Sequence, residues 1–463
     1  MEFLQVLDAP VEPGRLVEWV PRVEGGLGSW HRDGRSPSHN HEQHLRAAFE
    51  HRARTRREGG RESWLGLSID FDEPLSVPSL RTAMLGWINR HEVLRTHVVL
   101  KHDRTERYST QPGTVRLKMS RIGWYSDIDL LLEQVAGSFD RATAPLHWPA
   151  YRFATVARRT SFTLLFAADH SLVDGYSLVT AQYELTELYR SARDRRPHDL
   201  PPTGSYIDFS AAERTRADTA DASHRAVQTW REFLAEHGDV PRFVPLVPPA
   251  DDSDDPFDVE HPPQSSHSGR LLDAAQTAAL DVASATAGGN IVSAVLAALA
   301  LAYRSAAPES EFACVMPRHT RTDPAWEHAL GWFVGLAPVV VDVRDDPDFD
   351  TAVQRAAEGL VTGRHGARLP FLRVAELLGH TPAPRFVVSY MDARGTPSSA
   401  SADDGGARVL RSHSYSGDEV YIWVNRTTSG LRMHSRYPAE QPGPVLKFLD
   451  DFAGLLASTS AAM

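Results

Sequence analysis

The stretch FAADHSLVDGYSL, residues 166–178, stands where an apolar run ends and an amphipathic pattern begins. The run SFTLLFAA leading into it predicts a buried strand, and Asp174-Gly175 is a turn dipeptide. Beyond it, apolar residues recur at intervals of three and four, at Leu178, Ala181, Leu185 and Leu188. This spacing predicts a helix that reaches about residue 190 and buries one face. The sequence therefore places His170 and Asp174 in a short connection between a strand and a helix.

His170 is a candidate general base, because the unperturbed pKa of histidine, about 6.5, lies near working pH. A lone His-x-x-x-Asp carries little weight in a chain with 21 histidines. The alternative is a histidine that ends a strand with its hydrogen bonds satisfied. A glycine at position 175 lets the chain reverse sharply, so we expect the Asp174 carboxylate to fold back towards the histidine or towards a basic partner.

The composition is that of an ordinary globular protein, and its 463 residues suffice for two or more cores. A formal charge of −11 argues against a nucleic-acid partner. No apolar run is long enough to span a bilayer, and residues 1–30 show no leader pattern, so we expect a cytoplasmic protein. The single cysteine, Cys314, lies in the probable strand EFACVMP and is interpreted as a small core residue.

Helical and strand patterns alternate in both halves of the chain, which predicts two α/β or α+β lobes of similar size. Residues 51–62 are charged and contain glycine, so we expect a mobile loop there. The proline-marked RRPHDLPPTG, residues 195–204, is interpreted as a connector, which gives lobes of 1–205 and 206–463. Residues 248–263 are acidic and predict a solvated loop, and residues 291–305 predict an alanine-rich helix.

The motif D-H-S-L-V-D-G resembles the H-H-x-x-x-D-G signature of the condensation-domain and acyl-CoA-dependent acyltransferase superfamily. Asp169 stands where that signature has its first histidine, a form similar to the polyketide-associated acyltransferases of actinobacteria. The resemblance covers nearly the whole chain, through five further collinear segments: SHNHEQHLRAAF, INRHEVLRTHV, LPPTGSYIDFSAAER, MPRHTRTDPAWEHALGWFVGLAPVVV and FVVSYMDAR. The D-F-G-W-G motif of plant relatives is absent, as it is in this subgroup.

The resemblance implies two chloramphenicol-acetyltransferase-like lobes with an active-site tunnel between them. It implies that His170 faces the tunnel and removes the proton of an acceptor hydroxyl as the oxygen attacks a thioester. Asp174 would be structural and pair with Arg321, the best positional match. A backbone N–H near Gly175 is a candidate stabiliser of the oxyanion.

Other candidate site residues follow from the same resemblance. Tyr390 and Asp392 are candidates to line the tunnel near the acceptor; the alternative is that they finish a strand and its turn. Trp332 is a candidate for the tunnel wall, with a core residue as the alternative. We expect Asp169 to hold its loop by accepting backbone hydrogen bonds, since a neighbouring strand residue points to the opposite face. The alternative is that its charge tunes or orients His170.

The alternative of a metal site is raised by three closely spaced histidines, His39, His41 and His44. Their spacing fits neither a zincin helix nor a zinc finger. We interpret them as the polar entry to a helix capped by Ser38 and predict no metal.

The first functional hypothesis is a free-standing O-acyltransferase of specialised metabolism. Its co-substrates would be an acyl-CoA or acyl-carrier-protein thioester and a small alcohol, for example a trehalose-like sugar or a polyketide alcohol. No bound cofactor and a monomer are expected. The sequence ends at residue 463 without an attached carrier domain, so both substrates would arrive from solution or on another protein.

Two alternatives remain open. One is a free-standing condensation enzyme that forms an amide between carrier-bound substrates with the same histidine. The other is a catalytically inactive docking module, although such modules usually lose the base and His170 is retained.

Overall fold

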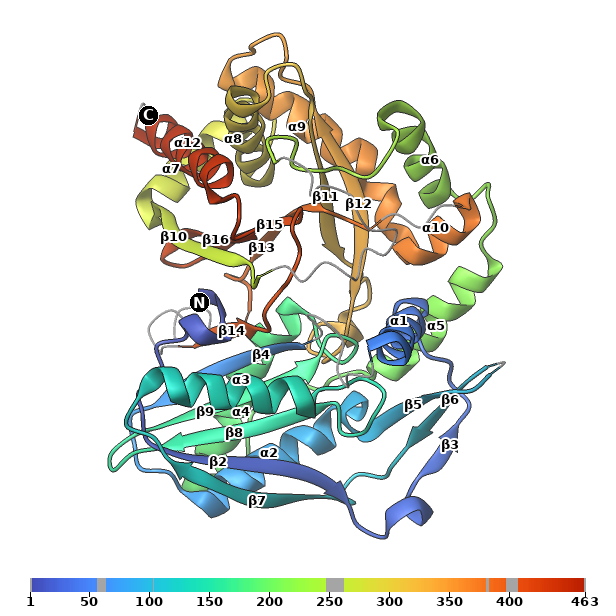
Figure 1. Cartoon of the computed structure of the whole chain (residues 1–463), viewed down its shortest axis with the longest axis vertical. Helices are drawn as coiled ribbons and strands as arrows, with labels where there is room; N and C mark the ends of the chain where they lie inside the picture. The colour runs from blue at the N-terminus through green and yellow to red at the C-terminus, as the bar shows by residue number, and fades with distance from the viewer. Residues whose placement is uncertain are drawn as a thin grey trace. The chain divides into compact units, whose positions relative to one another are not determined.

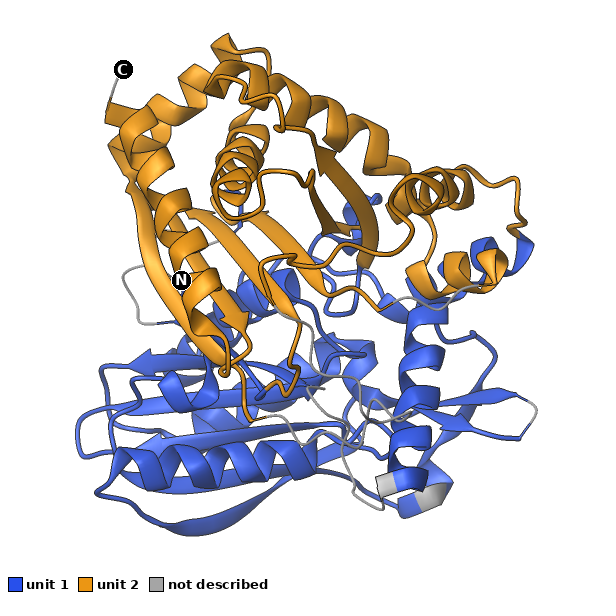
Figure 2. Cartoon of the chain, turned by 45° about the horizontal axis from the view of Figure 1, so that its top comes forward, with its two compact units in different colours: residues 1–219, 321–333, 395–413 blue, residues 220–320, 334–394, 414–463 orange. Residues whose placement is uncertain are grey.

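The computed structural model describes residues 2–55, 64–102, 104–246, 262–379, 383–396 and 407–461. The chain forms two compact units, coloured separately in Figure 2. The first comprises Met1–Thr219, Arg321–Phe333 and Gly395–His413, and the second comprises Ala220–Thr320, Val334–Arg394 and Ser414–Met463. This division differs from the predicted ranges 1–205 and 206–463, because the chain returns twice to the first unit and residues 206–219 remain in it.

A seven-stranded sheet forms the framework of the first unit. Its order is β1-β14-β4-β9-β8-β2-β7, with only the β1–β14 pair parallel. The strands are β1 (Glu2–Gln5), β14 (Arg408–Arg411), β4 (Trp64–Phe71), β9 (Phe162–Asp169), β8 (Tyr151–Ala157), β2 (Arg15–Val23) and β7 (Val115–Trp124). A smaller sheet has the order β3-β6-β5, from β3 (His31–Asp33), β6 (Thr105–Ser109) and β5 (Thr96–Leu100).

Strand β9 lies at the centre of the larger sheet, and all eight of its residues are buried. Leu165 and Ala167 share a core with helix α3 (Ile128–Ala142) on one face of the sheet. The alternate residue Phe166 packs edge-on against Trp87 of helix α2 (Val77–Arg90), which belongs to the other face. Because both faces are covered, the strand is apolar throughout rather than alternating, as the run SFTLLFAA indicates.

The remaining helices of the first unit are α1 (His39–Thr55), α4 (Gly175–Asp194) and α5 (Tyr206–Thr219). Helix α4 packs against α2 and buries the predicted face, since Leu178, Ala181, Leu185 and Leu188 are all less than a tenth exposed. Helix α1 continues to Thr55, so the loop predicted for 51–62 is wrong over residues 51–55. Charged residues tolerate a solvent-exposed helix end as readily as a loop. Residues 56–62 lie outside the described residues.

The second unit is built on a six-stranded sheet of order β10-β16-β15-β13-β11-β12. Its strands are β10 (Ser265–Asp273), β16 (Gly430–Tyr437), β15 (Val420–Thr427), β13 (Phe386–Asp392), β11 (Phe312–His319) and β12 (Val334–Val341). Its helices, labelled in Figure 1, are α6 (Arg225–His237), α7 (Ala274–Thr286), α8 (Ile291–Ala306), α9 (Phe349–Gly363), α10 (Phe371–Leu378) and α12 (Pro442–Ala461). Both units mix helices with sheets, so the predicted α/β (α+β) class is confirmed.

The predicted alanine-rich helix is α8, and it lies in the core of the second unit together with Cys314 of β11. Burial raises the pKa of the Cys314 thiol, which agrees with a packing role. Most of the predicted acidic loop, residues 248–261, lies outside the described residues.

Among the described helices, none by itself has the length and apolarity needed to cross a membrane. Helices α7 and α8 meet those criteria only as a pair, and the chain bends by 91° between them.

Candidate active site

His170 is the first residue beyond the central strand β9, and it is half-buried. Its Nδ1 is buried and has no hydrogen-bond partner among the described residues. The pKa of His170 is lowered, because burial disfavours the charged ring more strongly than the ring's own backbone carbonyl and the nearby carboxylates favour it. A neutral imidazole at neutral pH can accept a proton, so the electrostatics suit a general base.

Asp174 begins helix α4 as its N-cap, where its Oδ1 accepts a hydrogen bond of 2.8 Å from the backbone N–H of Ser177. Gly175 is the first helical residue, and its φ is not in the left-handed region. The interpretation of Asp174-Gly175 as a sharp turn is therefore wrong. A capping carboxylate gives the same direction to the chain without special backbone freedom.

The expected ion pair between Asp174 and Arg321 is present, and it is buried and bidentate. Arg321 Nη1 lies 2.8 Å from Asp174 Oδ2, and Nη2 lies 3.0 Å from Oδ1. The backbone N–H of Phe333 also donates to Oδ2, at 2.9 Å. Burial opposes the charge on Asp174, but Arg321 and these N–H donors outweigh it and hold the pKa of the carboxyl below its ordinary value.

Ser177 ties the start of α4 to the returning segment 321–333. Its Oγ donates to the carbonyl of Gly331 at 2.9 Å and accepts from the Gly331 N–H at 3.1 Å. Arg321 Nη2 donates to the same oxygen at 2.8 Å. Every one of these groups is buried or nearly so, so the segment is held by hydrogen bonds that cannot be exchanged for water at low cost.

Trp332 is placed beside His170 by that segment. The two ring centroids are 4.7 Å apart with the ring planes inclined by 45°. The other side of the segment packs on the aromatic residues of α5, since Phe333 lies 5.1 Å from Tyr206 and 4.5 Å from Phe209 between centroids. The half-buried indole therefore forms a wall of the site around His170.

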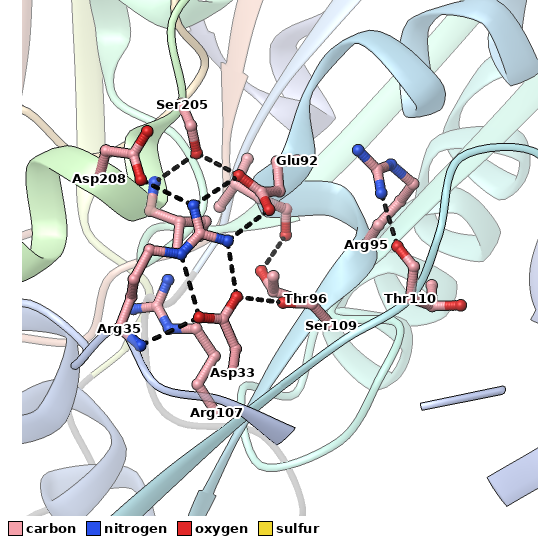
Figure 3. Close-up of polar contacts among 12 residues, drawn as sticks. Asp33, Arg35, Glu92, Arg95, Thr96, Arg107, Ser109, Thr110, Ser205 and Asp208 are labelled. Carbon is pink, nitrogen blue, oxygen red and sulfur yellow. Dashed lines mark hydrogen bonds and ion pairs between the residues drawn. The ribbon is translucent and has the colours of Figure 1, made fainter. Parts of the chain in front are cut away.

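A polar cluster fixes the beginning of α5, as Figure 3 shows. Arg35 donates to Asp33, to Glu92 and to Asp208, at distances of 2.6–3.1 Å. Ser205 donates to Glu92 as well, and its Oγ accepts from the backbone N–H of Ile207. Since these contacts hold the first turn of α5, they also fix the aromatic surface on which Phe333 and its segment rest.

Asp169 is wholly buried, and its Oδ1 accepts the backbone N–H of Ser171 at 2.9 Å. This contact is the loop-holding hydrogen bond expected for Asp169. Its second oxygen, Oδ2, lies 3.0 Å from Nε2 of His44, a contact that the sequence reasoning missed. The available signal was the carboxylate itself, because a buried charge in place of the family's histidine needs a partner.

The histidine cluster forms the polar entry of α1, as predicted. The Oγ of Ser38 accepts the backbone N–H of His41 at 3.1 Å. Within the ranges that the structure describes, no three His, Cys, Asp or Glu side chains are grouped so as to hold a metal ion.

Tyr390 and Asp392 belong to strand β13 of the second unit. Asp392 is paired with Arg394 at 2.7 Å, and both side chains are partly exposed. The pKa of Tyr390 is raised, first by burial and then by Asp392. Tyr390 and Asp392 thus belong to the second unit, whereas the other six predicted site residues belong to the first. Those six are Asp169, His170, Asp174, Gly175, Arg321 and Trp332.

Comparison with known proteins identifies relatives along almost the full length. The acyltransferase PapA3 of Mycobacterium tuberculosis is 26% identical over 93% of this chain and 92% of its own. The trehalose-2-sulfate acyltransferase PapA2 of the same organism is 29% identical over 61% of this chain and 60% of its own. These relatives confirm the predicted class of enzyme, an acyltransferase.

Solved structures confirm the predicted fold. The PapA2 acyl transferase superimposes with a TM-score of 0.86 at 21% identity, covering 99% of this chain and 100% of that one. The first condensation domain of the calcium-dependent antibiotic synthetase gives a TM-score of 0.69 at 16% identity, covering 93% and 97%. The family model named Condensation domain matches residues 59–411. Because this match spans more than half of the chain, the protein belongs to the condensation-domain family.

Proposed function

We propose that this acyltransferase moves an acyl group from a coenzyme A or carrier-protein thioester to a hydroxyl group, with His170 as the general base. The observation that carries the proposal is the position of His170. It follows a rigid central strand, its ring contacts Trp332, and burial keeps it neutral.

The proposed reaction needs one group that first accepts and then returns a proton. The Nε2 atom of His170 takes the hydroxyl proton as the acceptor oxygen attacks the thioester carbonyl carbon. The new C–O bond forms, the C–S bond breaks when the tetrahedral intermediate collapses, and the departing thiolate receives the proton from His170. The base is therefore regenerated, and no bound cofactor is required.

Two further features support this assignment. Gly175 is the first residue of α4, and N–H groups in the first turn of a helix lack intrahelical acceptors, so we propose its N–H as a donor to the developing oxyanion. Trp332, Tyr390 and Asp392 are the proposed substrate contacts. Asp174 and Arg321 are proposed to fix the loop rather than to touch substrate. Their charged groups are already hydrogen-bonded to each other, and Asp174 also accepts from the backbone.

The acceptor proposed is a sugar-like alcohol, supported by the relative named as a trehalose-2-sulfate acyltransferase. The alternative is amide formation between carrier-bound substrates, which is supported by the structural likeness to condensation domains. Both reactions would use His170, so only the product distinguishes them.

The test is mass spectrometry of products after incubation with a panel of acyl-CoAs and acyl-carrier proteins, offered matched alcohols and amines. We expect a new ester whose mass equals the sum of acyl group and alcohol, absent with His170→Ala. Amide as the sole product would favour the condensation reaction. Free acid as the sole product with every donor would contradict acyl transfer altogether.

A further inference from the structure

His44 enters the site from a distant part of the chain, helix α1, and meets the residue at which this sequence departs from the two-histidine signature. Its Nε2 lies 3.0 Å from Oδ2 of Asp169, whose side chain is 0% exposed. The His44 side chain is 22% exposed. A carboxylate that has lost all contact with water is stable only when it is paired and hydrogen-bonded. Asp169 obtains these partners from His44 and from the N–H of Ser171.

Trp332 connects this pair to the proposed base. Its ring lies edge-on to His44, with centroids 5.9 Å apart and planes at 83°, and it also contacts His170 at 4.7 Å. The two imidazoles are thus neighbours of one indole, and Asp169 is adjacent to His170 in the chain. Charges on Asp169 and His44 therefore both act on His170 at short range.

The two charges act in opposite directions. Burial opposes a proton on His44, but the Asp169 carboxylate outweighs it and raises the pKa of His44. For His170, burial lowers the pKa most, and the charge of His44 lowers it further, whereas Asp169 raises it. The raised pKa favours the protonated form of His44, and in that form its positive charge offsets the effect of the Asp169 carboxylate on His170.

Two further titratable groups lie near these rings. Asp174 also raises the pKa of His170, but less than Asp169 does, and its carboxylate is held in its own bidentate ion pair with Arg321. His41, one turn before His44, stays neutral, because burial and then Arg107 lower its pKa to about 3.

We propose that His44 is a positioning residue of the acyl-transfer site, which holds the Asp169 carboxylate in an ion pair so that no net charge lies beside the base. The inference rests on the proposed role of His170. It explains how an aspartate can occupy the place of a neutral histidine in the signature without converting the adjacent base into a permanently protonated ring.

The decisive experiment compares the pH dependence of kcat/KM for His44→Gln, Asp169→Asn and the double variant. In His44→Gln the carboxylate is unbalanced, so the pKa of His170 rises and the acidic limb moves to higher pH, by about one unit. In Asp169→Asn the carboxylate is absent, and the pKa of His44 is no longer raised by it. His44 then loses its proton more readily, so both charges disappear together. That limb is expected to stay close to the parent's, and the double variant is expected to return to the same position.

His31→Gln serves as the matched control, since His31 is exposed on β3 and is not among the groups that act on His170. It should leave the limb in place. An unmoved limb in His44→Gln, or a shift that persists in the double variant, would overturn the proposal.

Thermal unfolding supplies a second readout that needs no activity. His44→Gln leaves a buried carboxylate without its cation, so it should melt at lower temperature, and adding Asp169→Asn should restore much of the loss. No restoration would contradict the ion pair. His170→Ala measured in parallel separates the two claims. Near-normal turnover there refutes the base, whereas an inactive His170→Ala together with an unmoved limb in His44→Gln refutes only the role of His44.

Discussion

The two ends of the loop after β9 each carry a buried aspartate, and their partners differ in kind. Asp174, at the helix end, is held by Arg321, a guanidinium that stays charged throughout the working pH range, and by two backbone N–H groups. Asp169, at the strand end, is held by one backbone N–H and by His44, whose charge depends on pH. The helix end is therefore a fixed support, while the strand end, beside His170, can respond to protonation.

The largest expected effect belongs to the fixed support. Asp174→Ala leaves the Arg321 guanidinium buried without its carboxylate, which should lower the free energy of unfolding by about 3–5 kcal/mol. Activity should fall as well, because the segment bearing Trp332 loses its anchor. Denaturant unfolding with circular dichroism measures the change.

The same variant has a pH signature. The pKa of Asp174 is lowered in the folded state, so its stabilisation is complete above the unfolded pKa and is lost as pH falls through the folded value. The difference in the free energy of unfolding between the parent and Asp174→Ala should therefore be constant around neutral pH and become smaller in acid. Asp342→Ala, which breaks a half-exposed pair with Arg344, is the control and should cost at most about 1 kcal/mol. A variant of Asp174 that melts like the parent while losing turnover would instead make Asp174 catalytic.

A smaller effect is expected where the fixed support meets α5. A Cβ added at Gly331 would lie 2.2 Å from Tyr206 Cδ2 and 2.8 Å from Phe333 Cε2. Tyr206 is buried and cannot move aside freely, so Gly331→Ala should destabilise the protein by about 1–3 kcal/mol and displace Trp332 from His170. Thermal melts and kcat/KM measure both parts.

Gly28→Ala provides the comparison, because nothing lies within 4 Å of a Cβ built at that exposed position. It should leave the melting temperature and turnover nearly unchanged. Equal behaviour of the two alanine variants would show that the contact between α5 and the returning segment does not support the site.

The sequence predicted much of this arrangement from local pattern. An apolar run without alternation indicated β9, and helical spacing indicated α4. The Asp174–Arg321 pair, which joins residues 147 positions apart, was implied only by the family resemblance. Local pattern could not show that residues 321–333 return to the first unit, because such a return depends on Ser177, Asp174 and the α5 aromatics meeting in space.

His44 shows the same limit at a single residue. Read along α1, it is one of three polar histidines at a helix entry. Its partner lies 125 positions away, and nothing in the spacing of either motif joins them. The sequence analysis expected Asp169 only to accept backbone hydrogen bonds. A buried carboxylate needs a partner, and only the folded chain identifies His44 as that partner.

The central claim is that His170 moves the proton in acyl transfer, and His170→Ala tests it most directly. The measurement is kcat/KM for ester formation by the variant and the parent, with identical melting curves as the condition for comparison. Loss of the base predicts a folded protein whose kcat/KM is reduced on the order of 100-fold or more. A correctly folded His170→Ala protein with near-parent kcat/KM would contradict the assignment.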